Sequence, residues 1–307
     1  MVKKVDAVVV TYNRLGLLKK CLKAIINQTY EITNLFVIDN NSTDDTTLYL
    51  KQLSRKHSCI QPVYLSKNIG GAGGFYEGLK KYINNSDSDF VWIMDDDTIP
   101  SPTALEDLIL KTNKVSNLGF LASNVRWIDG SPAVMNIPQP IVEWNKNIKY
   151  GLVGIEYASF VSILFPRNVI FKVGLPIKDY FIWGDDVEFT KRITQKGFSG
   201  FMVINSVVKH EIKQNIGTNI ILEKSPTRIK RYYYARRNTM YTMKKRYGKK
   251  DFLKWIIYSM LVEPVKIVTS AKDQKLLRLK SSLKGTIVGL VYHPTIYKFK
   301  SNNINRH

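Results

Sequence analysis

Three short apolar segments in the first hundred residues each run directly into a polar cluster. They are Val5–Val10, Leu35–Ile38 and Phe90–Met94, and β-branched and aromatic side chains dominate them. Runs of this length and composition are typical of strands buried on both faces. Stretches with helical spacing, such as Leu15–Ile26, lie between them. Alternating strands and helices predict an α/β fold with a mainly parallel sheet and helices on both of its faces.

Ligands of such sheets collect at the carboxyl ends of the parallel strands. The polar clusters at 11–14, 39–41 and 95–97 all follow strands, so we expect the functional site at that edge. The remaining pattern predicts strands over Gln61–Leu65 and Val203–Val208, helices over Phe75–Ile83 and Pro102–Lys111, helix in the second half of Ile182–Lys196, and mostly helix from Ser225 onward.

The strongest local signal is Asp95-Asp96-Asp97, directly after an apolar strand. Alternate carboxylates at a strand end chelate a hard cation, and a hard cation balances the charge of a diphosphate. A solvated acidic turn is the alternative interpretation, and the position after a buried strand favours the metal site. His210 ends a later strand; it is either a structural histidine or the residue that completes the metal shell of Asp95 and Asp97.

The glycine-rich run at 70–74 has three interpretations: a flexible linker, a phosphate cradle, or part of a dinucleotide-binding fingerprint. The fingerprint should follow the first strand, where this chain has Thr11-Tyr12-Asn13-Arg14 instead. A dehydrogenase is therefore a weak alternative. We expect the backbone here to approach a ligand closely, and a sugar diphosphate suits that position.

Trp183-Gly184-Asp185-Asp186 joins an aromatic side chain to two acids at an expected helix N-terminus. The simple interpretation is a helix cap with acids that favour the helix dipole. The functional interpretation is a general base, since a carboxylate in a closed pocket accepts the proton of a sugar hydroxyl. Trp183 would then offer an apolar face to the acceptor sugar.

Together these segments resemble family 2 glycosyltransferases of the GT-A fold, over about residues 5 to 240. One such match would mean little, but five matches occur here in the same order as in that family. The matching pieces are Val8-Val9-Val10-Thr11-Tyr12-Asn13-Arg14, Val37-Ile38-Asp39-Asn40-Asn41-Ser42-Thr43-Asp44, Asp95-Asp96-Asp97, Gly184-Asp185-Asp186 and His210.

The resemblance implies an inverting transfer in which Asp186 is the general base and Asp185, where many members carry Glu, orients the acceptor. It implies that Asp95, Asp97 and His210 hold Mg²⁺ or Mn²⁺. It also implies a set of residues around the nucleotide sugar: Thr11, Asn13, Arg14, Asp39, Asn68, Gly70, Gly71, Gly73 and Asp96.

The donor is indicated by Asn68–Phe75, which resembles the corresponding segment of galactofuranosyltransferases and their rhamnosyltransferase relatives. This likeness implies UDP-galactofuranose as donor, with dTDP-rhamnose as the alternative. The implied acceptor is a hydroxyl of a cell-surface glycan or a lipid-linked oligosaccharide. A nucleotide-sugar-binding module without turnover is a further alternative, which the intact acids disfavour.

Positive charge is concentrated in the last third of the chain. Residues 224 to 300 hold 20 Lys and Arg against three acids, an excess of +17 out of a net +21. Such a region suits an anionic surface, either nucleic acid or the cytoplasmic leaflet of a membrane. Tyr232-Tyr233-Tyr234 beside Arg236-Arg237 would suit single strands, but no recognised nucleic-acid-binding motif is present, so nucleic acid is the lesser alternative.

The sequence therefore predicts two regions. Residues 1–222 form a catalytic domain, with a nucleotide-sugar half at about 1–100 and an acceptor half at about 101–222. Residues 223–307 form a basic helical region in which 252–262 is apolar but shorter than the roughly 20 residues that span a bilayer. We expect this segment to lie on a membrane surface; the alternative is a helix packed in the core. Without an apolar leader, the protein is expected in the cytoplasm, peripheral to the inner face of the membrane.

Overall fold

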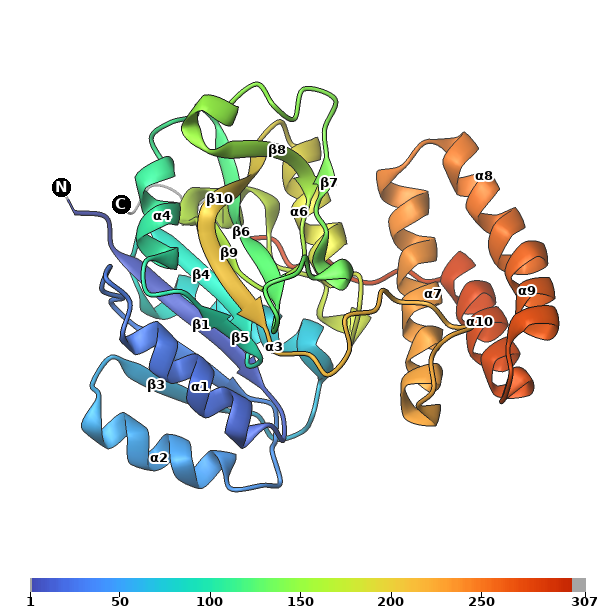
Figure 1. Ribbon diagram of the computed structural model, residues 1–307, viewed down its shortest axis with the longest axis horizontal. Coiled ribbons are helices and arrows are strands. Elements are labelled where there is room, and N and C mark those ends of the chain that lie inside the picture. Colours follow the sequence, from blue (N-terminus) through green and yellow to red (C-terminus); the bar gives the residue numbers. More distant parts are fainter. Residues whose placement is uncertain (1, 300–307) are drawn as a thin grey trace.

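The computed structural model describes residues 2–299, and one mixed sheet forms its centre (Figure 1). The strand order is β3-β2-β1-β4-β9-β6-β10-β8-β7, with β5 paired to β10. The strands are β1 (Val5–Thr11), β2 (Leu35–Asp39), β3 (Ile60–Tyr64), β4 (Phe90–Asp95), β5 (Thr98–Pro100), β6 (Leu118–Trp127), β7 (Gln139–Pro140), β8 (Leu152–Tyr157), β9 (Ile163–Pro166) and β10 (Ser199–His210).

The sheet is parallel in its first half and mixed in its second. Strands β3, β2, β1 and β4 run parallel to one another, and β6 runs parallel to β10. β9 runs antiparallel to β4 and to β6, and β8 runs antiparallel to β10. The α/β class is confirmed, while a mainly parallel sheet describes only the first hundred residues. The parallel pattern breaks because β9 lies between β4 and β6 and runs opposite to both, and because β8 runs opposite to β10.

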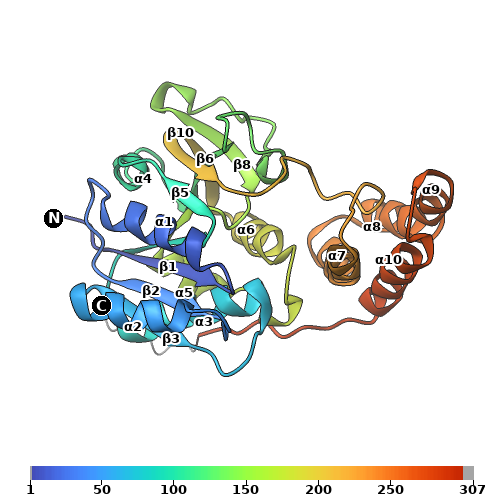
Figure 2. The same ribbon diagram turned by 60° about the horizontal axis from the view of Figure 1, so that its bottom comes forward.

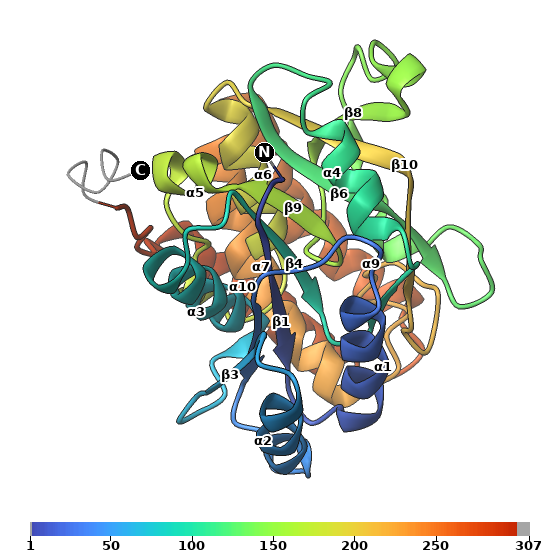
Figure 3. The ribbon, with the colours of Figure 1, turned by 90° about the vertical axis from the view of Figure 1, so that its left-hand side faces the viewer.

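Helices cover both faces of the sheet (Figure 3). Leucines of α1, α2 and α4 pack on the face that carries Val9, whereas α3, α5 and α6 pack on the face that carries Val8. The helices of this domain are α1 (Leu15–Ile26), α2 (Thr46–Lys56), α3 (Gly70–Asn85), α4 (Ala104–Lys111), α5 (Arg167–Val173) and α6 (Asp185–Gln195), with short 3₁₀ turns η1 (Val134–Asn136), η2 (Ile148–Tyr150) and η3 (Lys178–Tyr180). Successive strand residues point to opposite faces, so a run of buried valines serves both layers.

A helical region follows the sheet domain, as expected, and lies beside it (Figure 1). It comprises α7 (Pro226–Arg246), α8 (Lys249–Ile257), the π-helical turn η4 (Tyr258–Val262), α9 (Glu263–Ser270) and α10 (Lys275–Leu290). The chain then returns to the sheet domain (Figure 2), where Leu175 N donates to Tyr297 O at 3.0 Å. The proposed boundary at 222/223 falls in the segment before α7 and stays a prediction.

The glycine-rich run is not a loop, because α3 begins at Gly70 rather than at Phe75. A Cβ built on Gly74 would lie 2.4 Å from Val10 Cγ1, and one on Gly70 would lie 1.9 Å from Phe181 O. These glycines therefore let α3 approach β1 and the turn before α6. The close backbone approach predicted from the sequence is made to the protein itself. A Cβ on Gly71, in contrast, would meet nothing within 4 Å.

Candidate active site

The predicted site lies where three parallel strands end. Thr11 pairs in register with Asp39, and Val10 pairs with Asp95, so the ends of β1, β2 and β4 are level. Thr11 Oγ1 donates to Asp96 Oδ2 at 2.7 Å, which connects the first strand directly to the acidic turn. The expected edge of the sheet therefore carries the polar clusters together.

Arg14 is the cation that contacts the acidic turn. Its Nη1 lies 2.6 Å from Asp97 Oδ2 and 3.3 Å from Asp96 Oδ1, and both acids are buried while Arg14 is half exposed. Burial raises the pKa of Asp96 to about 6, against the opposing charge of Arg14. Burial and then the charges of Asp97 and Asp96 raise the pKa of Asp95 well above its ordinary value. The single positive charge of Arg14 therefore offsets only part of the repulsion among the three carboxylates.

His210 meets Asp97 because β10 pairs with the short strand that follows the acidic turn, with His210 opposite Thr98. His210 Nε2 lies 3.2 Å from Asp97 Oδ1, and its Nδ1 lies 2.7 Å from Asn136 Oδ1. Donation to Asn136 through Nδ1 leaves Nε2 directed at the acid. In the neutral form of His210, Asp97 Oδ1 is a buried oxygen without a hydrogen bond.

These features fit a divalent cation, although its geometry is not preformed. An orphaned buried oxygen, crowded carboxylates and a histidine oriented by a second hydrogen bond are what such a site requires. Within residues 2–299, however, no three His, Cys, Asp or Glu side chains already stand in a metal-binding arrangement. Contact with His210 and the charge of Arg14 outweigh burial and lower the pKa of Asp97. The set Asp95, Asp97 and His210 stays a prediction.

Two of the predicted nucleotide-contacting residues are held by the turn after β2. Asn13 has φ 53°, its side-chain Oδ1 accepts from Thr43 N at 2.7 Å, and its backbone N–H donates to Ser42 Oγ at 3.0 Å. Asp39 is buried, and its two carboxylate oxygens accept from Ser42 N at 2.9 Å and Thr47 Oγ1 at 2.6 Å. The structure brings both residues to the predicted edge; their contact with a nucleotide remains a prediction.

The start of α3 uses its backbone donors internally. Gly70 N donates to Asn68 Oδ1 at 2.8 Å, and Ala72 N donates to Phe181 O at 3.2 Å. Asn40 accepts from Ile69 N at 2.9 Å and donates to Gly70 O at 2.9 Å. These three N–H groups are therefore paired within the protein, and donor contact at the glycine-rich run stays a prediction. Gly71 is the position in this turn that faces open space.

The two acids after Trp183 open α6, as predicted. Asp185 is buried, and burial followed by the charge of Asp186 raises its pKa well above the ordinary value. Burial raises the pKa of Asp186 to about 6, while backbone N–H donors, including Val187 N at 2.7 Å, limit the rise. The charge of Asp185 also contributes, as the smallest of several causes, to the raised pKa of Asp95.

Trp183 is half-buried rather than freely exposed. Its ring packs edge-on against Tyr232 with 5.2 Å between centroids, and the Arg228 guanidinium lies over it at 6.0 Å. A stacked acceptor sugar would share the indole with these neighbours. The acceptor contact stays a prediction.

Several asparagines that hold the site were missed from the sequence. Asn136 orients His210, Asn40 holds the start of α3, and Asn238 donates to the turn before α6. Asn40 follows Asp39 in a motif that was interpreted for its acid. Its hydrogen-bond partner, Gly70 O, is 30 residues further along the chain. Asn136 and Asn238 carry no local signal, because a single Asn is ordinary in a loop or on an exposed helix face.

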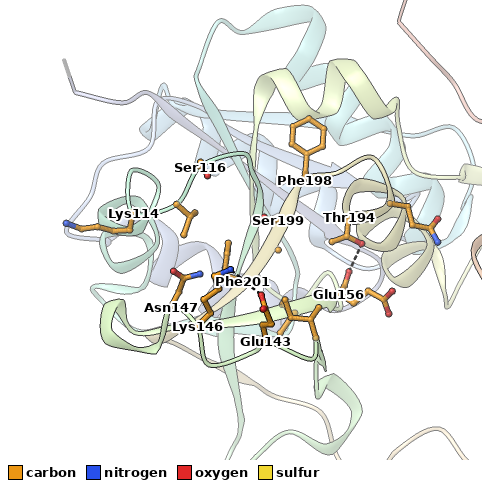
Figure 4. Close-up of a pocket in the computed structure, with 15 residues that line it drawn as sticks. Lys114, Ser116, Glu143, Lys146, Asn147, Glu156, Thr194, Phe198, Ser199 and Phe201 are labelled. Atoms are coloured by element: carbon orange, nitrogen blue, oxygen red, sulfur yellow. Dashed lines mark hydrogen bonds and ion pairs between the residues drawn. The ribbon is translucent and has the colours of Figure 1, made fainter.

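A cavity of about 610 Å³ lies elsewhere, at the amino end of β10 (Figure 4). Its lining includes Lys146, Glu156, Thr194 and Phe198, and it contains none of the predicted site residues. Since β10 enters this cavity at Ser199 and reaches the acids only at His210, the cavity is separate from the candidate site.

Comparison with known proteins agrees with the fold. A model of glycosyl transferase family 2 matches residues 6–164. Galactofuranosyltransferase GlfT1 of Mycobacterium tuberculosis (strain H37Rv) is 30% identical over 219 residues, and GlfT1 of Mycolicibacterium smegmatis is 28% identical over 218. These matches cover 64% and 63% of this chain, and 66% of each relative's length.

Solved structures share the fold at low sequence identity. GalNAc-T7, solved with UDP, GalNAc and Mn²⁺, has a TM-score of 0.63 at 14% identity, over 92% of this chain and 55% of that one. The mannosyltransferase PcManGT of Pyrobaculum calidifontis, solved with GDP-Man and Mn²⁺, has a TM-score of 0.55 at 16% identity, over 95% of this chain and 76% of that one.

The fold and these relatives define a glycosyltransferase of the GT-A type. The chain belongs to glycosyl transferase family 2, because the family model matches just over half of its residues. Asp95, Asp96 and Asp97 lie inside the matched range. Asp186 and His210 lie beyond it, so their roles rest on geometry and resemblance.

Proposed function

We propose that this enzyme transfers galactofuranose from UDP-galactofuranose to a hydroxyl of a glycan or lipid-linked acceptor, with inversion at the anomeric carbon. The observation that carries the proposal is the placement of a buried acidic turn and a second acid pair, Asp185-Asp186, close enough for their charges to interact. The carboxylates of the acidic turn suit a cation that binds the diphosphate of the donor. The acid pair suits deprotonation of the acceptor hydroxyl.

In this mechanism Asp186 removes the proton of the acceptor hydroxyl as that oxygen attacks the anomeric carbon, and the nucleoside diphosphate leaves. Asp185 orients the acceptor beside it. Asp95, Asp97 and His210 would hold Mg²⁺ or Mn²⁺, which stabilises the negative charge of the departing diphosphate. Arg14 would keep its contacts with Asp96 and with Asp97 Oδ2, because the oxygen of Asp97 that lies beside His210 is Oδ1.

The donor assignment rests on the named relatives and on Asn68–Phe75. Both relatives at 28 to 30% identity are named galactofuranosyltransferases. dTDP-rhamnose is the second candidate donor, favoured by the same segment. Gly71 faces open space in that segment, where a donor would approach the start of α3.

The test is turnover of a panel of nucleotide sugars with Mn²⁺ or Mg²⁺ present. UDP-galactofuranose should be hydrolysed slowly in water and faster with an acceptor, and EDTA should abolish both reactions. Use of UDP-glucose alone, with neither UDP-galactofuranose nor dTDP-rhamnose turned over, would refute the donor assignment. Donor binding without any turnover would point to the binding module instead.

We also propose that the helical region docks on an anionic membrane surface. Among the described residues no helix is long and apolar enough to cross a bilayer. An exposed apolar stripe nevertheless continues through α8, η4 and α9; it consists of Leu253, Ile257, Leu261, Val265 and Val268. The opposite side packs inward, with Ser259 and Glu263 buried. The expected surface segment is therefore an outward face that extends beyond residue 262.

The lysines around this stripe favour anionic lipid, rather than a second copy of the chain, as its partner. Exposed lysines flank it at positions 249, 250, 254, 266, 272 and 275. Each lysine near an anionic leaflet contributes about 1 kcal/mol. A second copy of the chain would bring the same cationic flanks together, which opposes self-association through this face.

Vesicle binding tests this docking surface. The protein should sediment with phosphatidylglycerol vesicles at low salt and not with phosphatidylcholine vesicles. Leu253→Ser with Leu261→Ser should weaken binding at least about tenfold, because a buried leucine contributes roughly 1.5–3 kcal/mol. The matched control is Leu48→Ser with Leu110→Ser, two exposed leucines of the sheet domain. Equal vesicle binding by the two double variants would exclude lipid docking at this stripe. A wild-type dimer that Leu253→Ser with Leu261→Ser converts to monomer would exclude it as well.

A further inference from the structure

The segment between η3 and α6 has an unusual backbone. Phe181 has φ 65° and ψ −60°, and Ile182 N donates to Tyr180 O at 2.7 Å. Together these define the rarer, strained form of the γ-turn. Trp183 and Gly184 follow with φ 65° and 86°. Non-glycine residues at positive φ persist only where neighbouring contacts hold them, so the contacts of this turn matter.

One side chain of α7 contacts three carbonyls of the turn. Asn238 Nδ2 lies 2.9 Å from Tyr180 O, 3.1 Å from Ile182 O and 2.8 Å from Trp183 O. Asn238 has no solvent exposure. These hydrogen bonds are therefore out of contact with bulk water.

The orientation of the Asn238 amide is itself fixed. Arg237 Nε and Nη2 lie 3.0 and 2.9 Å from Asn238 Oδ1. A guanidinium only donates, so the oxygen must face Arg237 and the NH₂ group must face the turn. Arg237 Nη2 also donates to Asp179 O at 2.6 Å, which ties the same helix to η3.

The turn connects the two sides of the candidate site. Phe181 O accepts from Ala72 N at 3.2 Å, and Gly70 leaves room for that carbonyl. At the other end of the turn, α6 starts with Asp185 and Asp186. Movement of the turn would therefore displace the acid pair relative to the start of α3.

We propose that Asn238 is a positioning residue: it holds the turn at Phe181 and thereby sets Asp186 against the donor side of the site. The catalytic part of this inference rests on the proposed role of Asp186. The structural part, that Asn238 holds the turn, does not.

Asn238→Asp and Asn238→Ala test the inference. The Asp variant keeps the shape but places oxygen against three carbonyl oxygens, while the Ala variant removes the contact without adding charge. Thr242→Val is the matched control: Thr242 is also buried on α7 and lies 2.8 Å from the Tyr180 hydroxyl, but it contacts none of the three carbonyls. Thermal melting identifies which variants are folded.

In folded Asn238 variants, amide hydrogen exchange over 178–190 should accelerate, while kcat falls by about 10²-fold and donor Kd stays within about threefold. Thr242→Val should change neither. Exchange at the wild-type rate in Asn238→Ala, or an equal loss in Thr242→Val, would overturn the proposal. If the wild type turns over no nucleotide sugar, the proposed function fails, whereas the exchange result still decides whether Asn238 holds the turn.

Discussion

The donor side and the acceptor side of this site are held in different ways. On the donor side, Asp39 and Asn13 bond to the turn after β2, and Thr11 bonds to the acidic turn across neighbouring strands. On the acceptor side, the turn before α6 depends on a helix more than 50 residues further along the chain. The proposed donor side is thus held within the sheet domain, whereas the turn on the proposed acceptor side is also held by the helical region.

The largest expected effect is at Asp186. Asp186→Asn keeps the shape but cannot accept a proton, so kcat should fall by about 10² to 10⁴ while donor and metal binding persist. Asp185→Asn should act mainly on acceptor KM, because its proposed role is to orient the acceptor. Steady-state kinetics of both variants with saturating metal, together with donor titration, make the comparison. Normal turnover by Asp186→Asn and loss in Asp185→Asn would reverse the two roles.

A second expectation concerns the donor side and its cation. Asp97→Asn removes a carboxylate from the predicted set, so Mn²⁺ affinity should fall by at least about 10- to 100-fold, and donor affinity should fall with it. Asp96→Asn should weaken Mn²⁺ less, because Asp96 contacts Thr11 and Arg14 rather than His210. Calorimetric titration with Mn²⁺ measures both variants. Unchanged Mn²⁺ affinity in Asp97→Asn would remove this residue from the cation site.

The acceptor side should also set the pH dependence. Burial raises the pKa of Asp186 to about 6, and a general base acts only when deprotonated. Turnover should therefore rise with pH through about 6 and level off above 7, with about a tenfold loss at pH 5. The measurement is kcat from pH 5 to 8 at saturating donor, acceptor and metal. A flat profile over this range would argue against Asp186 as the base.

The sequence predicted that the polar clusters share one edge of the sheet because each signal was local. Buried strands such as Val5–Val10 end in the polar residues that form the site, and parallel neighbours must end at one edge. The same reasoning joined Asp97 to His210, whose contact the structure contains. Family membership and the α/β fold were therefore accessible from residue patterns.

The acceptor side was less accessible because its determinants are distant contacts. No pattern around Asn238 indicates that its amide meets three carbonyls of residues 180–183. The glycine run was ambiguous for a related reason: glycines that allow a helix to pack against Val10 have the same composition as glycines that cradle a phosphate. A glycine-rich composition indicates that another group approaches the backbone closely, and only the fold shows which group that is.

The smallest expected effect separates two glycines of α3 that look alike in sequence. Gly74→Ala places a Cβ 2.4 Å from Val10 Cγ1 in the buried layer between α3 and β1. Overpacking of this kind costs about 1–3 kcal/mol of unfolding free energy, and donor affinity should change little once the protein is folded. Gly71→Ala meets nothing within 4 Å, so stability should be unchanged or rise by up to about 1 kcal/mol from helix propensity. Its methyl group should instead weaken donor binding. In chemical denaturation and donor titration, Gly74→Ala should lower stability with little change in donor affinity, and Gly71→Ala should do the reverse. Destabilisation by Gly71→Ala with unchanged donor affinity would contradict the idea that α3 packs on one side and receives the donor on the other.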